Sequence, residues 1–330
     1  MSTRDVLAIG TSAGGVEALL FLAKQMPRDF PASILVTIHL PPQAHSSLDE
    51  ILTRAGHLSA KFASEGEALQ KGHIYLAPPD HHLLLEGNRL CLGYGPRENN
   101  SRPAIDPMLR AAAVCCGPRS VGVVLTGTLG DGASGLWALS QCGGITAVQD
   151  PRDAVFAEMP MNALNRAKPN HVVKLVDMPA LFENLVQQPV GLPAVVPRSI
   201  KYELLIAKNG QSSMSEMDAI GRRSVLACPD CGGVMWEIDE DDLVKYRCHV
   251  GHAYGAELMS IALDENLRRA LGSAQRAMEE RVALAQKLYK QAVASGHQSL
   301  AETWSQKADE FEREMKIIRE SIRRMDQLAA

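Results

Sequence analysis

Short apolar runs alternate with amphipathic stretches over the first 187 residues. The run at residues 33–38 is almost wholly apolar, which is typical of a strand covered on both faces. Comparable runs, which we expect to be strands, lie at residues 6–9, 73–77, 120–125, 145–148 and 171–174. Stretches with helical spacing lie between them, at residues 16–26, 107–116 and 133–142. This alternation predicts an α/β fold, with a doubly wound, mostly parallel sheet and helices on both faces.

The pattern changes after residue 187. Residues 188–224 are first rich in proline and then polar, and we interpret them as a linker with one ordered stretch at residues 201–207. Residues 225–255 contain a group of cysteines and histidines, and residues 256–330 return to helical spacing. We therefore expect an α/β domain at residues 1–187, then a linker, a small zinc-ribbon-like module and a helical hairpin.

Two long helices are expected at the end of the chain. Gly296 lies in the segment ASGHQ and predicts a turn between them. Apolar residues of the second helix recur at alternating spacings of four and three, at Trp304, Ala308, Phe311, Met315, Ile318, Ile322 and Met325. This coiled-coil period predicts packing against the first helix as an antiparallel hairpin. A homodimer through these helices, or docking on a helical receptor, is a compatible alternative, because a hairpin alone exposes much apolar surface.

Composition and charge restrict the class of protein. The chain has 330 residues with 34 Lys and Arg against 38 Asp and Glu, and this net charge of −4 argues against a nucleic-acid binder. The opening MSTRDVLAIG lacks the basic segment and apolar segment of a secretory signal. No apolar run approaches the roughly 18 residues that span a bilayer. We expect a cytoplasmic protein that neither binds nucleic acid nor inserts into a membrane.

A serine lies in a sharp turn after the first predicted strand. The segment GTSAG at residues 10–14 fits the G-x-S-x-G pattern between a strand and a helix, which is the setting of a nucleophilic serine. Small neighbours let the chain turn and present the hydroxyl of Ser12, and the nearby helix N-terminus favours developing negative charge. For this motif alone, a plain glycine-rich turn or a phosphate-binding turn is the alternative.

Two further polar residues follow predicted strands. His39 comes directly after the strand at residues 33–38, and Asp131 lies in a glycine-rich loop after the strand at residues 120–125. Ligands bind outside the carboxyl ends of strands in open α/β sheets, so we expect Ser12, His39 and Asp131 to meet there. Taken alone, His39 fits an ordinary strand-end residue and Asp131 fits a helix N-cap. Three matching strand ends favour a Ser-His-Asp triad.

Five sequence blocks of the first domain resemble a known family. They are IGTSAGG, HLPP, NSRPAIDPM, VVLTGTLGDGASG and VFAEMPMNA, in that order within residues 5–187. They are similar to the catalytic domain of CheB-type chemotaxis methylesterases. The resemblance implies that Ser12, His39 and Asp131 form the catalytic triad. The chain order Ser, His, Asp differs from the order Ser, Asp, His of α/β-hydrolases, which disfavours a general carboxylesterase.

The resemblance implies hydrolysis of glutamyl methyl esters on the cytoplasmic helices of chemoreceptors, where some family members also deamidate glutamine. Catalysis is expected to need no cofactor. The backbone N–H of Ala13 and one from the Thr128 region are candidate donors to the oxyanion. Arg102 is a candidate substrate contact, with a surface salt bridge as the alternative. Thr128 replaces the Met of the family pattern LTGMGxDG.

The sequence leaves a second function open. The typical chemotaxis enzyme has an N-terminal receiver domain, whereas this chain begins at the catalytic domain, so we expect regulation by another route. Thr128 and the lack of a receiver favour a CheB-derived scaffold or adaptor, with weak or no esterase activity, that binds signalling partners through its C-terminal modules. The complete triad favours the enzyme.

Three of the seven cysteines are grouped near the C-terminal helices. Cys228 and Cys231 are separated by two residues and followed by Gly-Gly, a zinc-knuckle pattern, and Cys248 follows later. Adjacent side chains seldom reach one ion together, so we favour His252 over His249 as the fourth ligand. Relatives with this extension look like CPxCGG…RCRVGHAY, where only the later His is present. Four protein ligands predict a structural zinc ion. Reduced cysteines in a small hairpin without metal are the alternative.

Overall fold

The structure is a computed structural model that describes residues 3–43, 46–241 and 243–328. The chain divides into two compact units, Met1–Met259 and Ser260–Ala330. Helix α9 (Ala256–Ala294) contains the boundary between them. Every residue that the sequence assigns to a site lies in the first unit. Among the described residues, no helix combines the length and the apolar character needed to cross a bilayer.

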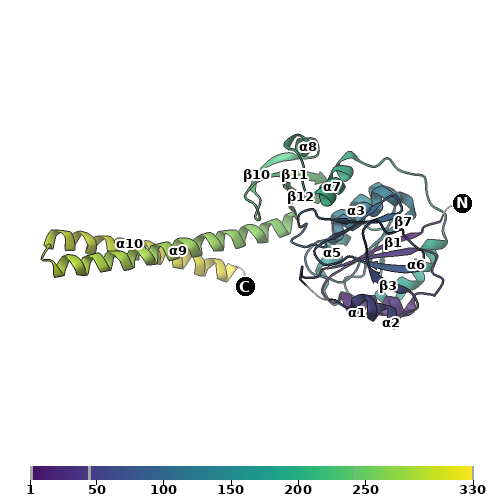
Figure 1. Cartoon of the computed structure of the whole chain (residues 1–330), viewed down its shortest axis with the longest axis horizontal. Helices are drawn as coiled ribbons and strands as arrows, with labels where there is room; N and C mark the ends of the chain where they lie inside the picture. The colour runs from purple at the N-terminus through teal and green to yellow at the C-terminus, as the bar shows by residue number, and fades with distance from the viewer. Residues whose placement is uncertain (1–2, 44–45, 242, 329–330) are drawn as a thin grey trace. The chain divides into compact units, whose positions relative to one another are not determined.

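Seven parallel strands form the central sheet of the first unit (Figure 1), in the order β3-β4-β2-β1-β7-β8-β9. From β1 the chain forms β2, β3 and β4 on one side, where β4 lies between β2 and β3, and then β7, β8 and β9 in order on the other side. The predicted doubly wound parallel sheet is therefore confirmed. The strands are β1 (Val6–Thr11), β2 (Ser33–Ile38), β3 (Ser59–Phe62), β4 (His73–Leu76), β7 (Ser120–Val124), β8 (Ile145–Gln149) and β9 (His171–Val173).

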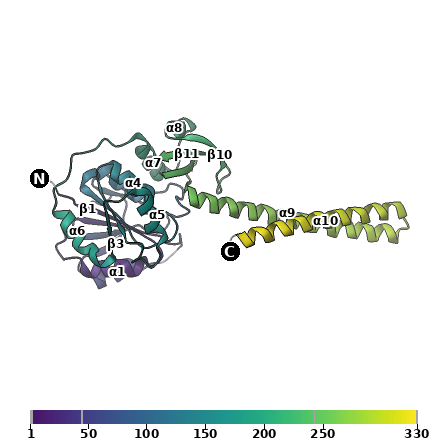
Figure 2. The ribbon, with the colours of Figure 1, turned by 180° about the vertical axis from the view of Figure 1, so that it is seen from behind.

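Helices cover both faces of this sheet (Figure 2). One apolar core packs the sheet against α1 (Gly15–Gln25), α2 (Leu48–Ala55) and α6 (Met178–Gln187). The other core packs it against α3 (Ile105–Cys116), α4 (Ala133–Gln141) and α5 (Glu158–Ala167). Strand β1 is completely buried between these layers. The loops at its carboxyl end are therefore held by rigid elements on both sides.

The segment predicted to be a linker contains two helices, α7 (Arg198–Asn209) and α8 (Met214–Asp218). Helix α7 is longer than the ordered stretch expected there, because it packs against α3 and the antiparallel hairpin β5 (His82–Glu86) and β6 (Arg89–Gly93). It buries Ile200, Glu203 and Ile206. Helix α8 begins with a capping box between Ser213 and Glu216.

The cysteine-containing module is a small antiparallel sheet in the order β10-β11-β12-β13. Its strands are β10 (Arg222–Ala227), β11 (Val234–Glu240), β12 (Leu243–Cys248) and β13 (Ala253–Gly255). Trp236 and Ile238 form its small apolar core with Ile206 of α7 and Met217 of α8. We call residues 222–255 the Cys/His module.

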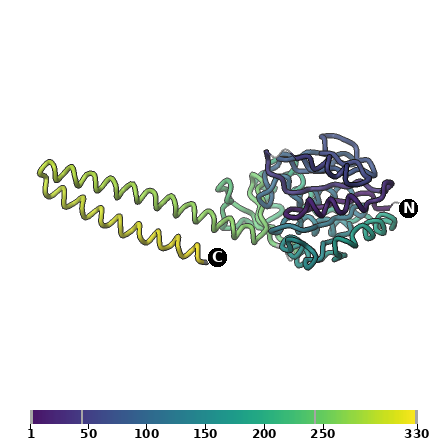
Figure 3. The backbone as a smooth tube through the Cα atoms, turned by 90° about the horizontal axis from the view of Figure 1, so that it is seen from below, coloured from purple at the N-terminus to yellow at the C-terminus, as the bar shows by residue number. Residues whose placement is uncertain are grey.

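The second unit is a helical hairpin of α9 and α10 (Gln298–Leu328), which run side by side (Figure 3). The predicted turn is present, with Gly296 in the left-handed region at φ 71°. Within residues 260–327, the small residues Ala285 and Ala301 are the most buried. Arg268 pairs with Asp326 at 2.6 Å across the two helices. The antiparallel packing is thus present within one chain, and dimerisation stays a prediction.

Candidate active site and metal site

The turn between β1 and α1 presents Ser12. The N–H of Ser12 donates to the carbonyl of Thr126 at 3.1 Å. The hydroxyl of Thr126, which is buried, donates to the carbonyl of Ala13 at 3.0 Å. Gly14 is the left-handed residue of the turn, with φ 74°. Ser12 is not among the positive-φ residues of the described chain, because Gly14 takes the left-handed position of the turn, which glycine adopts without strain.

The structure brings Ser12, His39 and Asp131 into one hydrogen-bonded array. Nδ1 of His39 lies 3.0 Å from Oγ of Ser12, and Nε2 lies 2.7 Å from Oδ2 of Asp131. The Asp131 carboxylate fixes the tautomer, because it needs a donor at Nε2 and so leaves the lone pair of Nδ1 facing the serine. The three residues follow the neighbouring strands β1, β2 and β7.

The N-terminus of α3 points at the carboxylate of Asp131. Oδ2 accepts the N–H of Ile105 at 2.6 Å, and Oδ1 accepts the N–H of Asp106 at 3.2 Å. Burial raises the pKa of Asp131, but the hydrogen bond and charge of His39, with the N–H of Ile105 and the amide of Asn99, outweigh it. The pKa of Asp131 therefore lies below its ordinary value, and the group is a carboxylate at neutral pH.

A second carboxyl group, Asp106, lies directly behind the first. Its Oδ1 accepts the N–H groups of Gly132 at 2.9 Å and Gly135 at 2.7 Å. Burial, followed by the charge of Asp131, raises the pKa of Asp106 to about 8. The amide of Asn99 donates to both acids, at 2.9 Å to Asp106 and 3.0 Å to Asp131. Sequence reasoning missed Asn99 and Asp106, although Asp106 lies in the block NSRPAIDPM.

The two candidate oxyanion donors are Ala13, which follows Ser12, and Thr128, which follows Gly127 in the loop after β7. Ala13 and Thr128 are partly exposed. Within the described residues, neither backbone N–H donates to a protein acceptor, whereas the neighbouring Gly127 N–H donates to Phe156 at 3.0 Å. Gly127 also permits close approach, because an added Cβ would lie 3.0 Å from Cβ of Ser12.

The loop after β7 departs from the family pattern at a second position. Leu129 stands where that pattern has Gly, and it is in the left-handed region at φ 65°. Two side chains of α5 hold it there. Its N–H donates to the carboxylate of Glu158 at 3.0 Å, and its carbonyl accepts from the amide of Asn162 at 2.7 Å. The shape of this loop therefore depends on α5.

Arg102, the candidate substrate contact, is engaged with groups of its own chain. Its Nη2 and Nε lie 2.7 and 3.0 Å from the carboxylate of Asp80. Its Nη1 donates to the carbonyl of Gly95 at 2.9 Å. The ion pair is the alternative that the sequence left open, and the guanidinium is used in holding residues 94–102 together. A substrate contact by Arg102 stays a prediction.

Cys228, Cys231, Cys248 and His252 meet in the Cys/His module, with all four ligand atoms within 4.8 Å of one another. Sγ of Cys231 and Sγ of Cys248 are 3.7 Å apart, and Nδ1 of His252 is 3.5 Å from Sγ of Cys248. Tetrahedral zinc with ordinary bond lengths requires separations of about 3.8 Å between sulfurs and about 3.6 Å between sulfur and nitrogen. The four side chains therefore fit a zinc ion.

The surroundings of these ligands also suit a cation. Nε2 of His252 faces the carboxylate of Asp230 at 3.8 Å, and Tyr254 donates to the same oxygen at 2.6 Å. This is the outer carboxylate that commonly orients a metal-binding imidazole. The hydrogen bond between Cys228 and Cys248 raises the pKa of Cys228 and lowers the pKa of Cys248, so that one of the two sulfurs carries a negative charge that the other cannot share. Three thiolates this close need a cation to be stable together.

A Ser-His-Asp array at the carboxyl edge of a doubly wound sheet is the arrangement of a serine hydrolase. Residues 7–182 match the family model described as CheB methylesterase. A Xanthomonas campestris relative, named protein-glutamate methylesterase/protein-glutamine glutaminase 1, is 39% identical over 178 residues. A relative from Leptospira interrogans, whose name gives the same two activities, is 34% identical over 184 residues. The chain therefore belongs to the CheB methylesterase family.

The comparisons cover the first part of the chain. The aligned region spans 56% of this chain and 95% of the Leptospira relative, but 53% of this chain and about half (49%) of the Xanthomonas relative. The CheB methylesterase catalytic domain of Thermotoga maritima is similar in structure, with a TM-score of 0.53 and 30% identity. That comparison covers 56% of this chain and 100% of the other. Residues after 182 lie outside the family model.

Proposed function

We propose that this protein is a protein-glutamate methylesterase that hydrolyses glutamyl methyl esters on chemoreceptors. The observation that carries the proposal is the hydrogen-bonded array of Ser12, His39 and Asp131, within the residues that match the CheB methylesterase family. The names of the relatives support the substrate class. The scaffold alternative has no comparable support, because all three polar side chains are present and in contact.

Ser12 is the proposed nucleophile. Its hydroxyl donates to Nδ1 of His39, and as Oγ attacks the ester carbonyl carbon, Nδ1 takes the proton. Asp131 keeps its hydrogen bond to Nε2–H and stabilises the imidazolium that forms. It does so as a carboxylate, because its pKa lies below the ordinary value.

The tetrahedral intermediate carries negative charge on the former carbonyl oxygen. We assign its stabilisation to the backbone N–H groups of Ala13 and Thr128. Their neighbours Gly127 and Leu129 already use their own N–H groups, toward Phe156 and Glu158. Since both donors are backbone groups, the replacement of the family Met by Thr128 leaves them in place.

His39 then returns its proton to the leaving methanol. A water molecule gives a proton to the same nitrogen and attacks the acyl-enzyme carbonyl, which releases a glutamate side chain and restores the hydroxyl of Ser12. A glutamine side chain follows the same steps with ammonia as the leaving group. We therefore propose glutaminase activity at the same site.

Methanol release from methylated chemoreceptor fragments tests the proposed activity. The wild type should release methanol, and the Ser12→Ala variant should not. Ser64→Ala, which changes an exposed serine away from the array, should keep the wild-type rate. If the wild type releases no more methanol than Ser12→Ala, the proposed function is wrong. Ammonia release from fragments with glutamine at the same position tests the second activity.

We also propose that Cys228, Cys231, Cys248 and His252 hold one structural zinc ion, a proposal supported by the spacing of their ligand atoms. Metal analysis of purified protein should find about one zinc per chain, since four protein ligands fill a tetrahedral site. Cys231→Ser should lower both the zinc content and the melting temperature. Cys115→Ser is the control, because Cys115 donates to the carbonyl of Leu85 far from the cluster and serine keeps this bond. A wild type without zinc would contradict the prediction.

The proposed substrate lies on the cytoplasmic helices of chemoreceptors, so we propose a cytoplasmic location and a chemoreceptor as the partner. We also propose that residues 1–187 form the catalytic domain, that residues 225–255 form a zinc-ribbon-like module packed against it, and that residues 256–330 form a helical hairpin. The Cys/His module lies in the same compact unit as the catalytic domain.

A further inference from the structure

The Cys/His module contacts the segment that precedes α3. The N–H of Asn99 donates to the carbonyl of Ala253 at 2.8 Å, and the N–H of Gly255 donates to the side-chain oxygen of Asn99 at 3.1 Å. Glu98 forms an isolated parallel bridge with Ala253. Strand β13 therefore holds both the backbone and the side chain of Asn99.

Asn99 joins this strand to the catalytic acid. Its side-chain oxygen faces Gly255, so its NH2 group faces the carboxylates of Asp106 and Asp131. The donor from β13 thus fixes which end of the amide meets the acids. Asn99 has φ 48°, a left-handed conformation that asparagine tolerates better than most residues. Because both ends of the Asn99 side-chain amide form hydrogen bonds, the position of Asn99 determines where the carboxylate of Asp131 is held.

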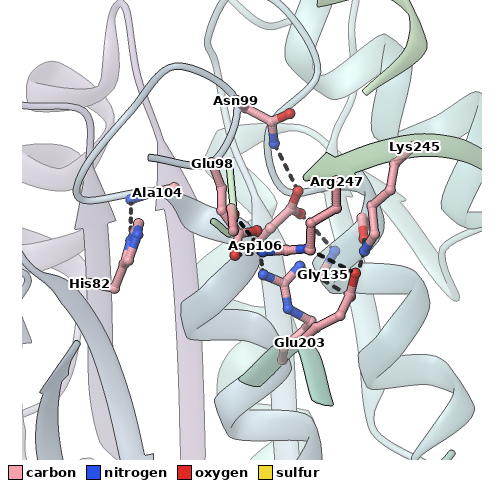
Figure 4. A network of polar contacts seen from close by, with 12 residues as sticks. His82, Glu98, Asn99, Ala104, Asp106, Gly135, Glu203, Lys245 and Arg247 are labelled. Atoms are coloured by element: carbon pink, nitrogen blue, oxygen red, sulfur yellow. Dashed lines mark hydrogen bonds and ion pairs between the residues drawn. The ribbon is translucent and has the colours of Figure 1, made fainter. Parts of the chain in front are cut away.

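Behind Asn99, a cluster of six charged side chains joins the module to the catalytic domain. Each is at most 5% exposed, and together they balance three acids with three bases. We call this the buried ion cluster, and it consists of Glu98, Arg110, Glu203, Glu240, Lys245 and Arg247. Figure 4 shows Glu98, Glu203, Lys245 and Arg247 gathered beside Asp106.

The contacts of the cluster cross between elements. Arg247 of β12 lies 2.8 Å from the carboxylate of Glu98, which also pairs with Arg110 of α3. Lys245 of β12 pairs with Glu203 of α7 and donates to Ser134 of α4 at 2.9 Å. Buried charges of this kind are stable only while every partner is present. The cluster therefore fixes the module on the catalytic domain.

The metal ligands adjoin these contacts. Cys248 follows Arg247, and His252 precedes Ala253, while Arg247 and Ala253 are themselves paired across β12 and β13. An ion bound by Cys248 and His252 closes the turn at residues 248–252. Closing that turn holds Arg247 at Glu98 and Ala253 at Asn99.

We propose that the Cys/His module is an intramolecular positioning device for catalysis: it holds Asn99, and Asn99 holds Asp131 against His39. Asn99 is thus a positioning residue, and the module supports the hydrolase without touching the substrate. Metal in the module raises the rate of the chemical step. This inference rests on the proposed assignment of Ser12, His39 and Asp131 as a triad, and on the proposed zinc site.

Substitution of Asn99 tests whether Asn99 positions Asp131. Asn99→Gly removes the amide and suits the left-handed backbone, and Asn100→Gly is the matched control, since Asn100 is exposed with φ 62°. We expect Asn99→Gly to lower kcat by about tenfold to a hundredfold, because a displacement of about 1 Å in a catalytic group has effects of this size. KM should be unchanged, and Asn100→Gly should behave as the wild type.

Two readouts separate positioning from general damage and do not need a receptor substrate. One is the low-field proton resonance of His39 Nε2–H, which reports the hydrogen bond to Asp131. The other is the labelling rate of Ser12 by an alkyl fluorophosphonate, in which Oγ bonds to phosphorus and fluoride leaves. Asn99→Gly should shift the resonance and slow the labelling. If both stay as in the wild type, the proposal is wrong.

Zinc removal tests whether the Cys/His module positions Asn99. Chelation of the wild type and the Cys231→Ser variant should both shift the His39 resonance and speed amide hydrogen exchange at residues 97–101, with readdition of zinc reversing the effect of chelation. If zinc leaves while the resonance and the exchange stay unchanged, the coupling is wrong. A wild type that labels at Ser12 but releases no methanol from receptors would refute the proposed substrate and leave the positioning to be judged by these readouts.

Discussion

Gly127 lies where any side chain would meet Ser12, the proposed nucleophile. An added Cβ would stand 2.6 Å from the terminal methyl carbon of Met159 and 3.0 Å from Cβ of Ser12. We predict that Gly127→Ala lowers kcat by about tenfold or more, because a small displacement of a reacting group has large effects on rate. Overpacking should also lower the free energy of unfolding by about 1–3 kcal/mol.

Gly130→Ala is the control for this prediction. The same added atom at Gly130 would have its nearest neighbour at 3.5 Å, an ordinary contact in the same loop. Steady-state kinetics and urea unfolding of both variants make the measurement. A Gly127→Ala enzyme as fast as Gly130→Ala would show that the close approach at residue 127 does not matter.

Asp106 should make stability depend on pH. Its pKa is raised from 3.8 to about 8, so its contribution to stability is fully present below about pH 4 and is lost as the pH rises toward 8. The free energy of unfolding should fall over this range by up to about 1.4 kcal/mol per pH unit. Asp106→Asn cannot lose a proton, so this fall should be smaller in the variant.

Urea unfolding at pH 5 and at pH 7.5 measures that difference. Asp177→Asn, at an exposed carboxyl outside the site, should follow the wild type. Equal falls in stability for the wild type and Asp106→Asn would mean that Asp106 does not retain a proton in the folded protein.

The site residues that directly follow a predicted strand could be identified from the sequence. Those whose contacts depend on distant parts of the chain could not. Ser12, His39 and Asp131 each follow an apolar strand, so the sheet topology brings them to one edge. Asn99 reaches Asp131 across 32 positions in sequence, through a turn whose shape depends on β13. No local pattern encodes that contact. The role of Asn99 therefore required the three-dimensional structure.

At the scale of elements, α5 controls the loop that carries Thr128. Leu129 is left-handed, which costs about 1–2 kcal/mol for a residue with a Cβ, and the amide of Asn162 holds it. We predict that Asn162→Ala lowers the free energy of unfolding by about 1 kcal/mol, the usual effect of one lost hydrogen bond. It should also lower kcat, because the proposed oxyanion donor adjoins Leu129.

Leu129→Gly should restore part of both losses when combined with Asn162→Ala, because glycine adopts this backbone without strain. Asn165→Ala changes an exposed residue one turn further along α5 and should have no effect. Thermal unfolding and steady-state kinetics of the single and double variants measure the two losses. Equal losses in the single and the double variant would contradict the role given to Leu129.

Helix α7 is longer than the sequence pattern predicts. Its sequence follows a proline-rich stretch and includes Glu203 and several other polar residues, which is typical of a linker. Glu203 is nevertheless 1% exposed, because Lys245 and the arginines 110 and 247 surround it. Burial of a charge by distant partners has no signal in local hydrophobic patterning.

At the scale of the whole molecule, one of the two units holds all the polar sites described above. The proposed triad, the Cys/His cluster and the buried ion cluster all lie in Met1–Met259, while Ser260–Ala330 holds most of the helical hairpin. The coiled-coil spacing made the hairpin predictable, since its packing repeats locally. The packing of the Cys/His module against the catalytic domain was not predictable. It depends on individual charged side chains of α3, α7, β11, β12 and the segment before α3, which are far apart in the sequence.

This division predicts that the hairpin can be damaged without loss of Ser12 chemistry. Ala285 is 1% exposed in α9, and its neighbour Leu284 is 57% exposed. Ala285→Glu buries a charge without a partner and should melt the hairpin, with a loss of helical ellipticity and of one thermal transition. Leu284→Glu should do neither. Because the proposed triad lies in Met1–Met259, labelling of Ser12 by a fluorophosphonate should proceed at the wild-type rate in both variants. A slower rate in Ala285→Glu alone would mean that the hairpin supports the active site, and the two units would then have to be treated as one functional body.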